Sequence, residues 1–111
     1  MEAIPRELRV YETAAGKCPF DDWLEGLRDA KGRAVIQVRL DRLERGNSGD
    51  CKAVGEGVLE LRIDFGPGYR VYFAEDGARI VLLLIGGDKS TQQKDIKTAK
   101  KYWNEYQGRS Q

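Results

Sequence analysis

The chain has 111 residues, 33% of them charged, and a formal net charge of +1 at pH 7. It contains no histidine, which removes the commonest general base and the commonest zinc ligand. Acid–base chemistry would therefore fall to lysine, arginine, tyrosine or carboxylates. The longest apolar segment, residues 80–85, is far shorter than the ~20 residues of a membrane span, and we expect one soluble cytoplasmic domain, 1–111, with no membrane contact.

The two cysteines, Cys18 and Cys51, are spaced like no metal-binding motif. A cytoplasmic location keeps thiols reduced, so we expect free thiols rather than a disulfide. We also expect no metal and no cofactor, because the sequence contains no plausible cluster of ligands.

Charge is distributed unevenly along the chain. From Lys89 to Gln111 there are six lysines or arginines and two acids, a local balance of +4, so the remainder carries −3. One basic surface of this kind suits contact with a polyanion. A solvated, lysine-rich helix face is the alternative.

The N-terminal half predicts one strand and two helices. Residues 8–11 favour a short first strand. Apolar residues then recur at helical spacing in two stretches separated by Gly32, which predicts an antiparallel pair of helices. The apolar positions are Phe20, Trp23, Leu24 and Leu27 in the first helix, and Val35, Val38 or Arg39, and Leu43 in the second. Residues 47–56 are polar and contain glycine, which is typical of a loop.

Residues 57–91 are the most informative part of the chain. Apolar and polar residues alternate over 59–64 and again over 69–73, with the period of half-buried strands. A turn at 65–67 places Ile63 opposite Tyr69, and therefore Arg62 opposite Arg70. Like charges that face each other across a sheet are destabilising, and a local rule broken without evident compensation is expected where function lies.

A third strand follows after a two-residue turn at 76–77. This turn places Phe73 opposite Ile80 and Arg70 opposite Leu83, and continued alternation brings Lys89 to the face of the two arginines. Residues 80–85 are apolar on both faces. Val81, Leu83 and Ile85 would lie on the arginine side, where either the last helix or a partner protein must cover them.

The last helix begins with a candidate capping box, in which Ser90 accepts from the helix and Gln93 reaches back. Its apolar stripe comprises Ile96, Ala99, Trp103 and Tyr106, for which packing in the core is the expected role. Its basic face comprises Lys94, Lys97 and Lys101, which are candidates for contact with RNA.

The family resemblance depends on two segments and on the order of the predicted elements. The segments are ELRIDFGPGYRVYF (residues 60–73) and GGDKSTQQKDIKTAKKYW (residues 86–103). That order is strand, two helices, three-stranded antiparallel meander and C-terminal helix, an α+β arrangement. With these features the chain resembles the RelE/ParE toxin superfamily, and within it the HigB-like addiction module killer branch related to phage Gp49. The resemblance implies a toxin that a cognate antitoxin neutralises. RelE- and HigB-like members cleave mRNA in the ribosomal A site, whereas ParE-like members poison DNA gyrase.

The resemblance also implies site residues. Arg70, in the GYR motif, matches an arginine that stabilises phosphate in RelE-like nucleases. Arg62 lies where such nucleases often carry a lysine, and Lys89 lies where a basic residue often assists the leaving group. Some relatives use a tyrosine or histidine as general base in the last segment, but here Ile96 stands near that place.

Several side chains remain open to more than one role. Glu60, Asp64 and Asp88 are candidate general bases, and each is equally suited to neutralising an arginine. Helix capping is the alternative for Asp88. Tyr72, on the predicted arginine face, is a candidate for stacking on an RNA base, with a cross-strand packing role as the alternative. Phe65 is a weaker candidate of the same kind.

The leading hypothesis is a type II toxin that acts as a ribosome-dependent mRNA endoribonuclease, with Arg62, Arg70, Lys89 and Asp88 as catalytic candidates. Its expected partners are the ribosome, mRNA and a helix-turn-helix antitoxin. One alternative is a non-enzymatic inhibitor of DNA gyrase. Another is a phage-derived nucleic-acid-binding module without catalysis.

Overall fold

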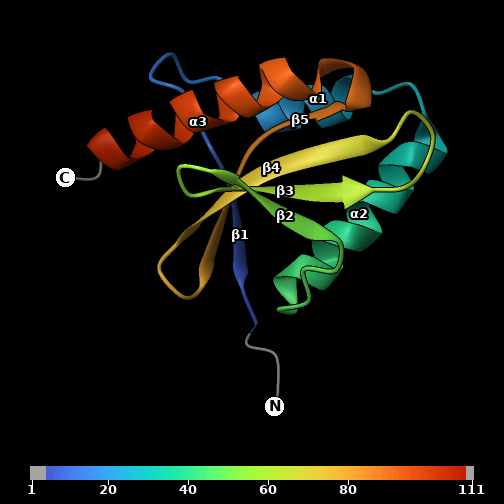
Figure 1. Ribbon diagram of the computed structural model, residues 1–111, viewed down its shortest axis with the longest axis horizontal. Coiled ribbons are helices and arrows are strands. Elements are labelled where there is room, and N and C mark those ends of the chain that lie inside the picture. Colours follow the sequence, from blue (N-terminus) through green and yellow to red (C-terminus); the bar gives the residue numbers. More distant parts are fainter. Residues whose placement is uncertain (1–4, 110–111) are drawn as a thin grey trace.

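The computed structural model describes residues 5–109; residues 1–4 and 110–111 of the expected domain 1–111 lie outside the described part. The predicted α+β class is confirmed, with one strand more than expected (Figure 1). The elements are β1 (Glu7–Val10), α1 (Pro19–Gly26), α2 (Ala30–Glu44), β2 (Cys51–Gly55), β3 (Val58–Ile63), β4 (Tyr69–Asp76), β5 (Ile80–Asp88), the short 3-10 helix η1 (Lys89–Thr91) and α3 (Gln92–Arg109). None of the helices in the described range is long and apolar enough to cross a membrane.

The strands form one sheet in the order β1-β5-β4-β3-β2. Neighbouring strands are antiparallel except β1 and β5, which pair in parallel. The chain reaches this parallel pair through α1, α2 and the β2–β4 meander, so the last strand lies between the first strand and the hairpins. This topology places β4 at the centre of the sheet, with β1 and β2 at its edges.

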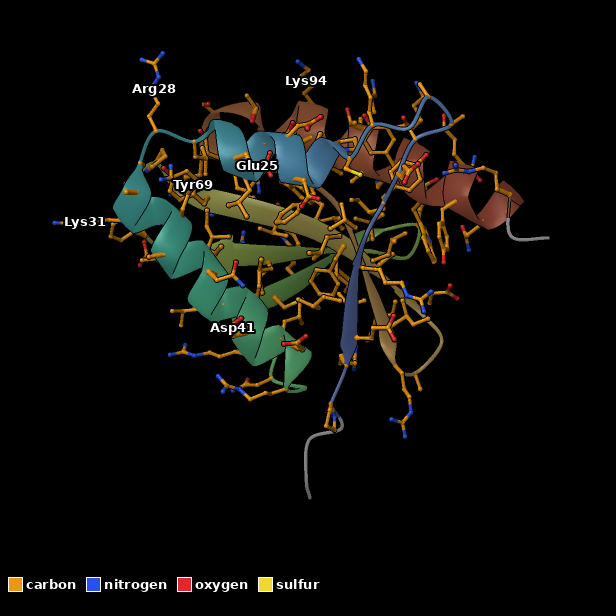
Figure 2. The ribbon with its side chains drawn as sticks, turned by 180° about the vertical axis from the view of Figure 1, so that it is seen from behind. Glu25, Arg28, Lys31, Asp41, Tyr69 and Lys94 are labelled. Carbon is orange, nitrogen blue, oxygen red and sulfur yellow. The ribbon has the colours of Figure 1, made fainter. Side chains whose placement is uncertain are left out.

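Helices cover both faces of the sheet. Seen from behind, α1 and α2 lie across one face, while α3 crosses the other (Figures 1 and 2). Two buried clusters correspond to these layers: Phe20, Ile36, Leu40, Leu61 and Val71 belong to the first, and Tyr72, Leu82, Leu84, Ala99 and Trp103 to the second. The predicted stripe of α3 is confirmed. In α2 the buried stripe runs through Ile36, Leu40 and Leu43, whereas Val38 is 48% exposed.

The N-terminus of α2 is tied to the start of β4. Asp29 caps the helix by accepting from the amide of Gly32, and it also accepts from the hydroxyl of Tyr69 at 2.8 Å. The amide of Gly32 first, and then the Tyr69 hydroxyl, hold the pKa of Asp29 below its usual range. Gly32 lies inside α2 rather than at the predicted break between the helices. A Cβ there would stand 2.5 Å from Oδ2 of Asp29, which explains why a glycine occupies this position.

The loop predicted over residues 47–56 is wrong in its second half, where β2 pairs with β3. At the edge of the sheet β2 has a neighbour on one side only, and Lys52, Ala53 and Gly55 are exposed. An exposed edge strand needs no apolar alternation. The pattern from which the other strands were predicted is therefore absent here.

The first hairpin has the predicted register, with Arg62 opposite Arg70 and Ile63 opposite Tyr69. The second hairpin does not. Phe73 pairs with Leu83 because the turn between Asp76 and Ile80 is one residue longer than predicted. Arg70 pairs with Gly87 because the register shifts by a further residue between Tyr72 and Phe73.

The longer turn also changes which face of β5 residues 80–83 occupy, whereas Ile85 lies on the arginine face as predicted. Val81 and Leu83 pack in the cluster under α1 and α2, whereas Leu82 and Leu84 pack under α3. Of the two predicted covers for the arginine face, the last helix or a partner protein, the structure shows the last helix, α3. Val81 and Leu83, however, are buried on the opposite side from the one expected, and they leave no apolar surface for a partner to cover.

Adjacent glycines in β5 let helices approach both faces of the sheet. A Cβ on Gly86 would stand 2.1 Å from Cε3 of Trp23 in α1, and a Cβ on Gly87 would stand 1.9 Å from Oδ2 of Asp95 in α3. Real Cβ atoms do not approach other atoms so closely. The GG pair of the GGDKST segment therefore fixes how close α1 and α3 lie to the end of β5, next to Arg70 and Lys89.

The capping box predicted at Ser90 is absent. Asp88 is the N-cap of η1 instead, and its Oδ1 accepts from both the amide and the hydroxyl of Ser90. A carboxylate at this position satisfies helix-end amides as well as a serine would. The helical segment is therefore capped two residues earlier in the chain than expected, at Asp88 rather than Ser90.

Candidate functional site

A cavity of about 290 Å³ lies at the end of the sheet where β3 ends, β4 begins and β5 passes into η1. Figure 1 shows the arrowhead of β3 and the start of α3 on this same side of the molecule. The cavity is polar. Its lining residues are Asp50, Arg62, Asp64, Gly68, Arg70 and Lys89.

The two arginines that face each other across β3 and β4 share a buried carboxylate. Nε of Arg62 donates to Oε1 of Glu60 at 3.1 Å, and Nε of Arg70 lies 4.0 Å from the same oxygen. The Glu60 side chain is almost completely inaccessible to solvent. The compensation for the like-charge pair is therefore a third charge beneath it, on the same strand as Arg62.

The other oxygen of Glu60 is held from two directions. Oε2 accepts from the hydroxyl of Tyr72 at 2.9 Å and from Nε2 of Gln92 at 2.8 Å. Burial alone would raise the pKa of Glu60, but the bonds from Gln92, Tyr72 and Arg62 outweigh burial and lower it. Glu60 is therefore an anion in the folded protein, with one oxygen facing the arginines and one anchored to the core.

Arg70 is mostly enclosed, and its donors have defined targets. Nη1 donates to the carbonyl oxygens of Gly68 at 3.2 Å and Tyr69 at 3.1 Å. Nε is buried and has no hydrogen-bond partner within residues 5–109, since Glu60 is 4.0 Å away. These contacts leave Nη2 as the nitrogen available to a group that enters the cavity.

Lys89 is positioned by Gly68. The amide of Lys89 donates to the Gly68 carbonyl at 3.1 Å, and the aliphatic part of its side chain passes over the glycine. Gly68 has a φ of +81°, and a Cβ there would stand 3.0 Å from Cγ of Lys89. Glycine is thus required twice, for its backbone conformation and for the space that the lysine stem occupies. The ammonium end is exposed beside the cavity.

Carboxylates also line the cavity. Asp50 and Asp64 are both exposed, so the lining holds three cations and two anions. Arg39 of α2 holds the segment that carries Asp50, donating to the carbonyls of Ser48 and Asp50 and to that of Arg62. The cavity therefore presents opposite charges close together rather than a uniformly positive surface.

Of the catalytic candidates, Arg62, Arg70 and Lys89 are brought together as predicted, and Asp64 joins them. Asp88 is not among the residues that line this cavity; its carboxylate caps η1.

The expectation that Tyr72 is exposed for base stacking is wrong. It shares a strand face with Arg70, but α3 covers it completely, and its hydroxyl is used by Glu60. Burial, followed by the bond to Glu60, raises the pKa of Tyr72. Phe65 is half-buried and packs against the core beneath α1 and α2.

The basic face of α3 is exposed but separate from the cavity. Lys94, Lys97 and Lys101 are all exposed, and Figure 2 shows Lys94 pointing away from the sheet. Lys100 differs, because it is half-buried and pairs with Glu56 at 3.5 Å.

Sequence reasoning missed Asp50 and Gln92. Asp50 stood in a segment interpreted as loop, and the signal that could have found it is its proximity to Arg62 once β2 is paired with β3: the Arg62 amide donates to the Asp50 carbonyl at 2.9 Å. Gln92 carried no usable signal. Its role depends on the angle at which α3 leaves η1.

Comparison with known proteins places residues 22–104 within the model of one family, described as phage derived protein Gp49-like (DUF891). The chain is also similar to an uncharacterized protein of Haemophilus influenzae, with 54% identity over 81 residues that make up 73% of this chain and 82% of the relative. The matched region contains every lining residue of the cavity. The chain therefore belongs to the phage-derived Gp49-like family.

Proposed function

We propose that the protein is the toxin of a type II toxin–antitoxin pair and that it cleaves mRNA on the ribosome, without a metal or a cofactor. The observation that carries the proposal is the meeting of Arg62, Arg70 and Lys89 around one cavity. Membership of the Gp49-like family, which is consistent with toxins of the RelE and HigB type, supports it.

The cavity offers groups for the chemistry of RNA self-cleavage. In that reaction the 2′-oxygen bonds to the adjacent phosphorus, the bond from phosphorus to the 5′-oxygen breaks, and the products are a 2′,3′-cyclic phosphate and a 5′-hydroxyl. Negative charge develops on the phosphoryl oxygens, which planar guanidinium groups bind well. Arg62 and Arg70 would stabilise that charge, and the exposed Lys89 ammonium would donate a proton to the departing 5′-oxygen.

The proton on the 2′-hydroxyl needs a base. Glu60 is buried and committed to its four neighbours, and Asp88 caps η1. Asp64 is exposed at the same cavity as both arginines. Of the carboxylates considered from the sequence, Asp64 therefore fits this role best, with Asp50 on the cavity wall as a second carboxylate.

The cavity wall carries no aromatic side chain among the described residues that line it. Single-stranded RNA readers usually hold splayed bases on aromatic rings. A site that binds the phosphate but supplies no stacking surface needs another macromolecule to hold its RNA in place. This favours a ribosome-bound substrate over free RNA.

A cognate antitoxin is part of the proposal. The exposed basic face of α3 suits a partner segment with net negative charge. A helix-turn-helix protein encoded beside this chain is the expected candidate.

A second function is favoured by the charge balance of the cavity. With Asp50 and Asp64 on the wall and Glu60 beneath it, three carboxylates offset the three cations. Such a site also suits a nucleic-acid-binding module that does not cleave. Inhibition of DNA gyrase is the remaining alternative from the sequence.

The test is induction of the protein in cells without its partner, beside the Arg70→Lys variant at equal protein level. The proposal expects protein synthesis to stop first and new 5′ ends to arise inside translated codons, both lost in the variant. Purified ribosomes programmed with one mRNA should give the same ends. DNA synthesis that stops first, with intact transcripts, would favour gyrase, and binding of RNA without cleavage would favour the module.

A further inference from the structure

We infer that Glu60 is a positioning residue, which orients the guanidinium groups of Arg62 and Arg70 so that their terminal nitrogens serve the cavity. The inference deepens the proposed function and rests on it, since it concerns the same two arginines. Its physical content is separate from cleavage. It states that a buried anion orients Arg62 through a hydrogen bond and Arg70 through charge attraction, the latter together with the carbonyls of Gly68 and Tyr69.

The inference rests on the different contacts of the two Glu60 oxygens, one toward the arginines and one toward Tyr72 and Gln92. Oε1 faces Nε of Arg62 at 3.1 Å and Nε of Arg70 at 4.0 Å, while Oε2 is fixed by Tyr72 and Gln92. Nε lies on the inner edge of a guanidinium group. A carboxylate that holds this edge turns the outer, terminal nitrogens in the opposite direction.

The arrangement spans both layers that meet at the cavity. Glu60 lies opposite Tyr72, and Arg62 lies opposite Arg70, so the four side chains form a square on one face of β3 and β4. Gln92, at the first residue of α3, closes the square from above. The carboxylate is thus held by the sheet and by the helix at once, and it cannot follow the arginines if they move.

An amide replaces this carboxylate only if Tyr72 and Gln92 turn from donors into acceptors, and it carries no charge. Tyr72 and Gln92 both present N–H or O–H donors to one side of the group, and the two arginines present donors to the other. Both oxygens of a carboxylate accept, whereas an amide has an accepting end and a donating end. In Glu60→Gln the donating end must face either the arginines or Tyr72 and Gln92, and the negative charge that attracts both guanidinium groups is lost, so the arginines lose their fixed direction.

The experiment compares Glu60→Gln with Asp64→Asn. Each removes one negative charge, the first from beneath the cavity and the second from its wall. The first readout is the exchange with water of the Nε–H protons of Arg62 and Arg70, followed by NMR. The second is the affinity for inorganic phosphate, followed through the same signals. Neither readout needs a ribosome or toxicity.

Positioning predicts opposite results for the two variants. In Glu60→Gln, Nε–H exchange should accelerate and phosphate affinity should fall, each by about tenfold, the size expected for loss of one hydrogen bond to a charged group. In Asp64→Asn, exchange should stay as in the wild type and phosphate affinity should rise. Glu60→Gln that leaves exchange unchanged and binds phosphate more tightly, as Asp64→Asn does, would overturn the inference.

Gln92→Ala keeps the test decisive if Glu60→Gln does not fold. It removes one anchor of the carboxylate without changing its charge, so exchange at both arginines should accelerate by a smaller factor. Wild-type exchange in Gln92→Ala would show that the carboxylate does not need its anchor, and would contradict the inference. If the NMR results hold but no mRNA is cut on ribosomes, the proposed reaction fails and the positioning role of Glu60 stands.

Discussion

The hydroxyl of Tyr72 donates to the carboxylate of Glu60 across the β3–β4 ladder at 2.9 Å, with both residues at 0% exposure. The bond lies under α3, where Tyr72 packs in a buried apolar cluster with Leu82, Leu84 and Ala99. A buried anion is tolerated there only because each of its oxygens has donors. The pair therefore links the packing of the core to the direction of the arginines in the cavity.

This pair makes stability depend on pH in a defined way. The folded pKa of Glu60 lies below its ordinary value of 4.5, so its contribution is present above that pH and is lost as the pH falls through the folded pKa. Tyr72→Phe should lower the free energy of unfolding at pH 7 by about 2 kcal/mol, because it removes a bond to a charged, buried acceptor. The difference from the wild type should shrink below pH 4.5, as urea unfolding over a pH series would measure.

Tyr106→Phe is the matched control for that series. Tyr106 also donates to a carboxylate, Asp76, at 2.6 Å, but both residues are only half-buried. Its cost at pH 7 should stay below about 1 kcal/mol, because solvent can replace the lost bond. A Tyr72→Phe cost that equals the control, or that does not change with pH, would show that Glu60 is not held as an anion by this bond.

The second prediction concerns the shape of the Arg70 side chain. Arg70→Lys keeps the positive charge but loses the planar group that donates to the carbonyls of Gly68 and Tyr69. Cleavage should fall about a hundredfold or more, the loss that follows removal of one preorganised donor to a developing oxyanion. The rate of mRNA cleavage on purified ribosomes measures it, and the melting temperature reports whether the fold is kept.

Arg9→Lys serves as the control for this substitution. Arg9 is exposed on β1 and pairs with Glu7, away from the cavity lining. Its cleavage rate should match that of the wild type. Full activity in Arg70→Lys would mean that a point charge is sufficient, and that the fork of Arg70 has a structural role only.

The third prediction tests the approach of α3 to β5. Gly87→Ala would bring a Cβ to 1.9 Å from Oδ2 of Asp95 and to 2.9 Å from Oγ1 of Thr91. Overpacking of this kind costs about 1–3 kcal/mol, and it should displace the start of α3. Thermal unfolding measures the cost. Gly108→Ala is the control, because Gly108 lies in α3 and no described atom lies within 4 Å of the added Cβ. It should be neutral or slightly stabilising. Equal melting temperatures for the two variants would refute this account of the glycine pair.

The Arg62–Arg70 relationship could be predicted because it depends only on local rules. Two alternating runs joined by a short glycine-containing turn have one register that buries both apolar sets, and the predicted pairing of Ile63 with Tyr69 is the observed one. A one-residue slip would have moved every apolar side chain of one strand to the opposite face. The pairing of the two arginines was therefore accessible from the sequence alone.

The second hairpin was not accessible in the same way. An irregularity between Tyr72 and Phe73 adds a residue to one strand, and nothing in the alternation reveals it, because β5 is apolar on both faces. Once the register is wrong, side chains are assigned to the wrong layer. The turn after Asp76 is also one residue longer than expected, and this is why Val81 and Leu83 were expected on the arginine face. The face of Tyr72 was predicted correctly, but its burial was missed because the alternation does not reveal that α3 covers that face.

The last prediction concerns the antitoxin and the basic face of α3. Lys97 and Lys101 are exposed, and since the apolar residues of β5 are covered within the chain, charge is the feature that this face offers a partner. Lys97→Glu with Lys101→Glu should slow association with the cognate antitoxin by about tenfold at low salt and weaken its salt dependence, because rim charges act mainly on the encounter rate. Stopped-flow mixing at several salt concentrations would measure both effects. Lys31→Glu is the control, since Lys31 is exposed on α2 and Figure 2 shows it far from Lys94 on α3. If Lys31→Glu slows association while the α3 double variant does not, the antitoxin docks on the helical pair α1 and α2 instead.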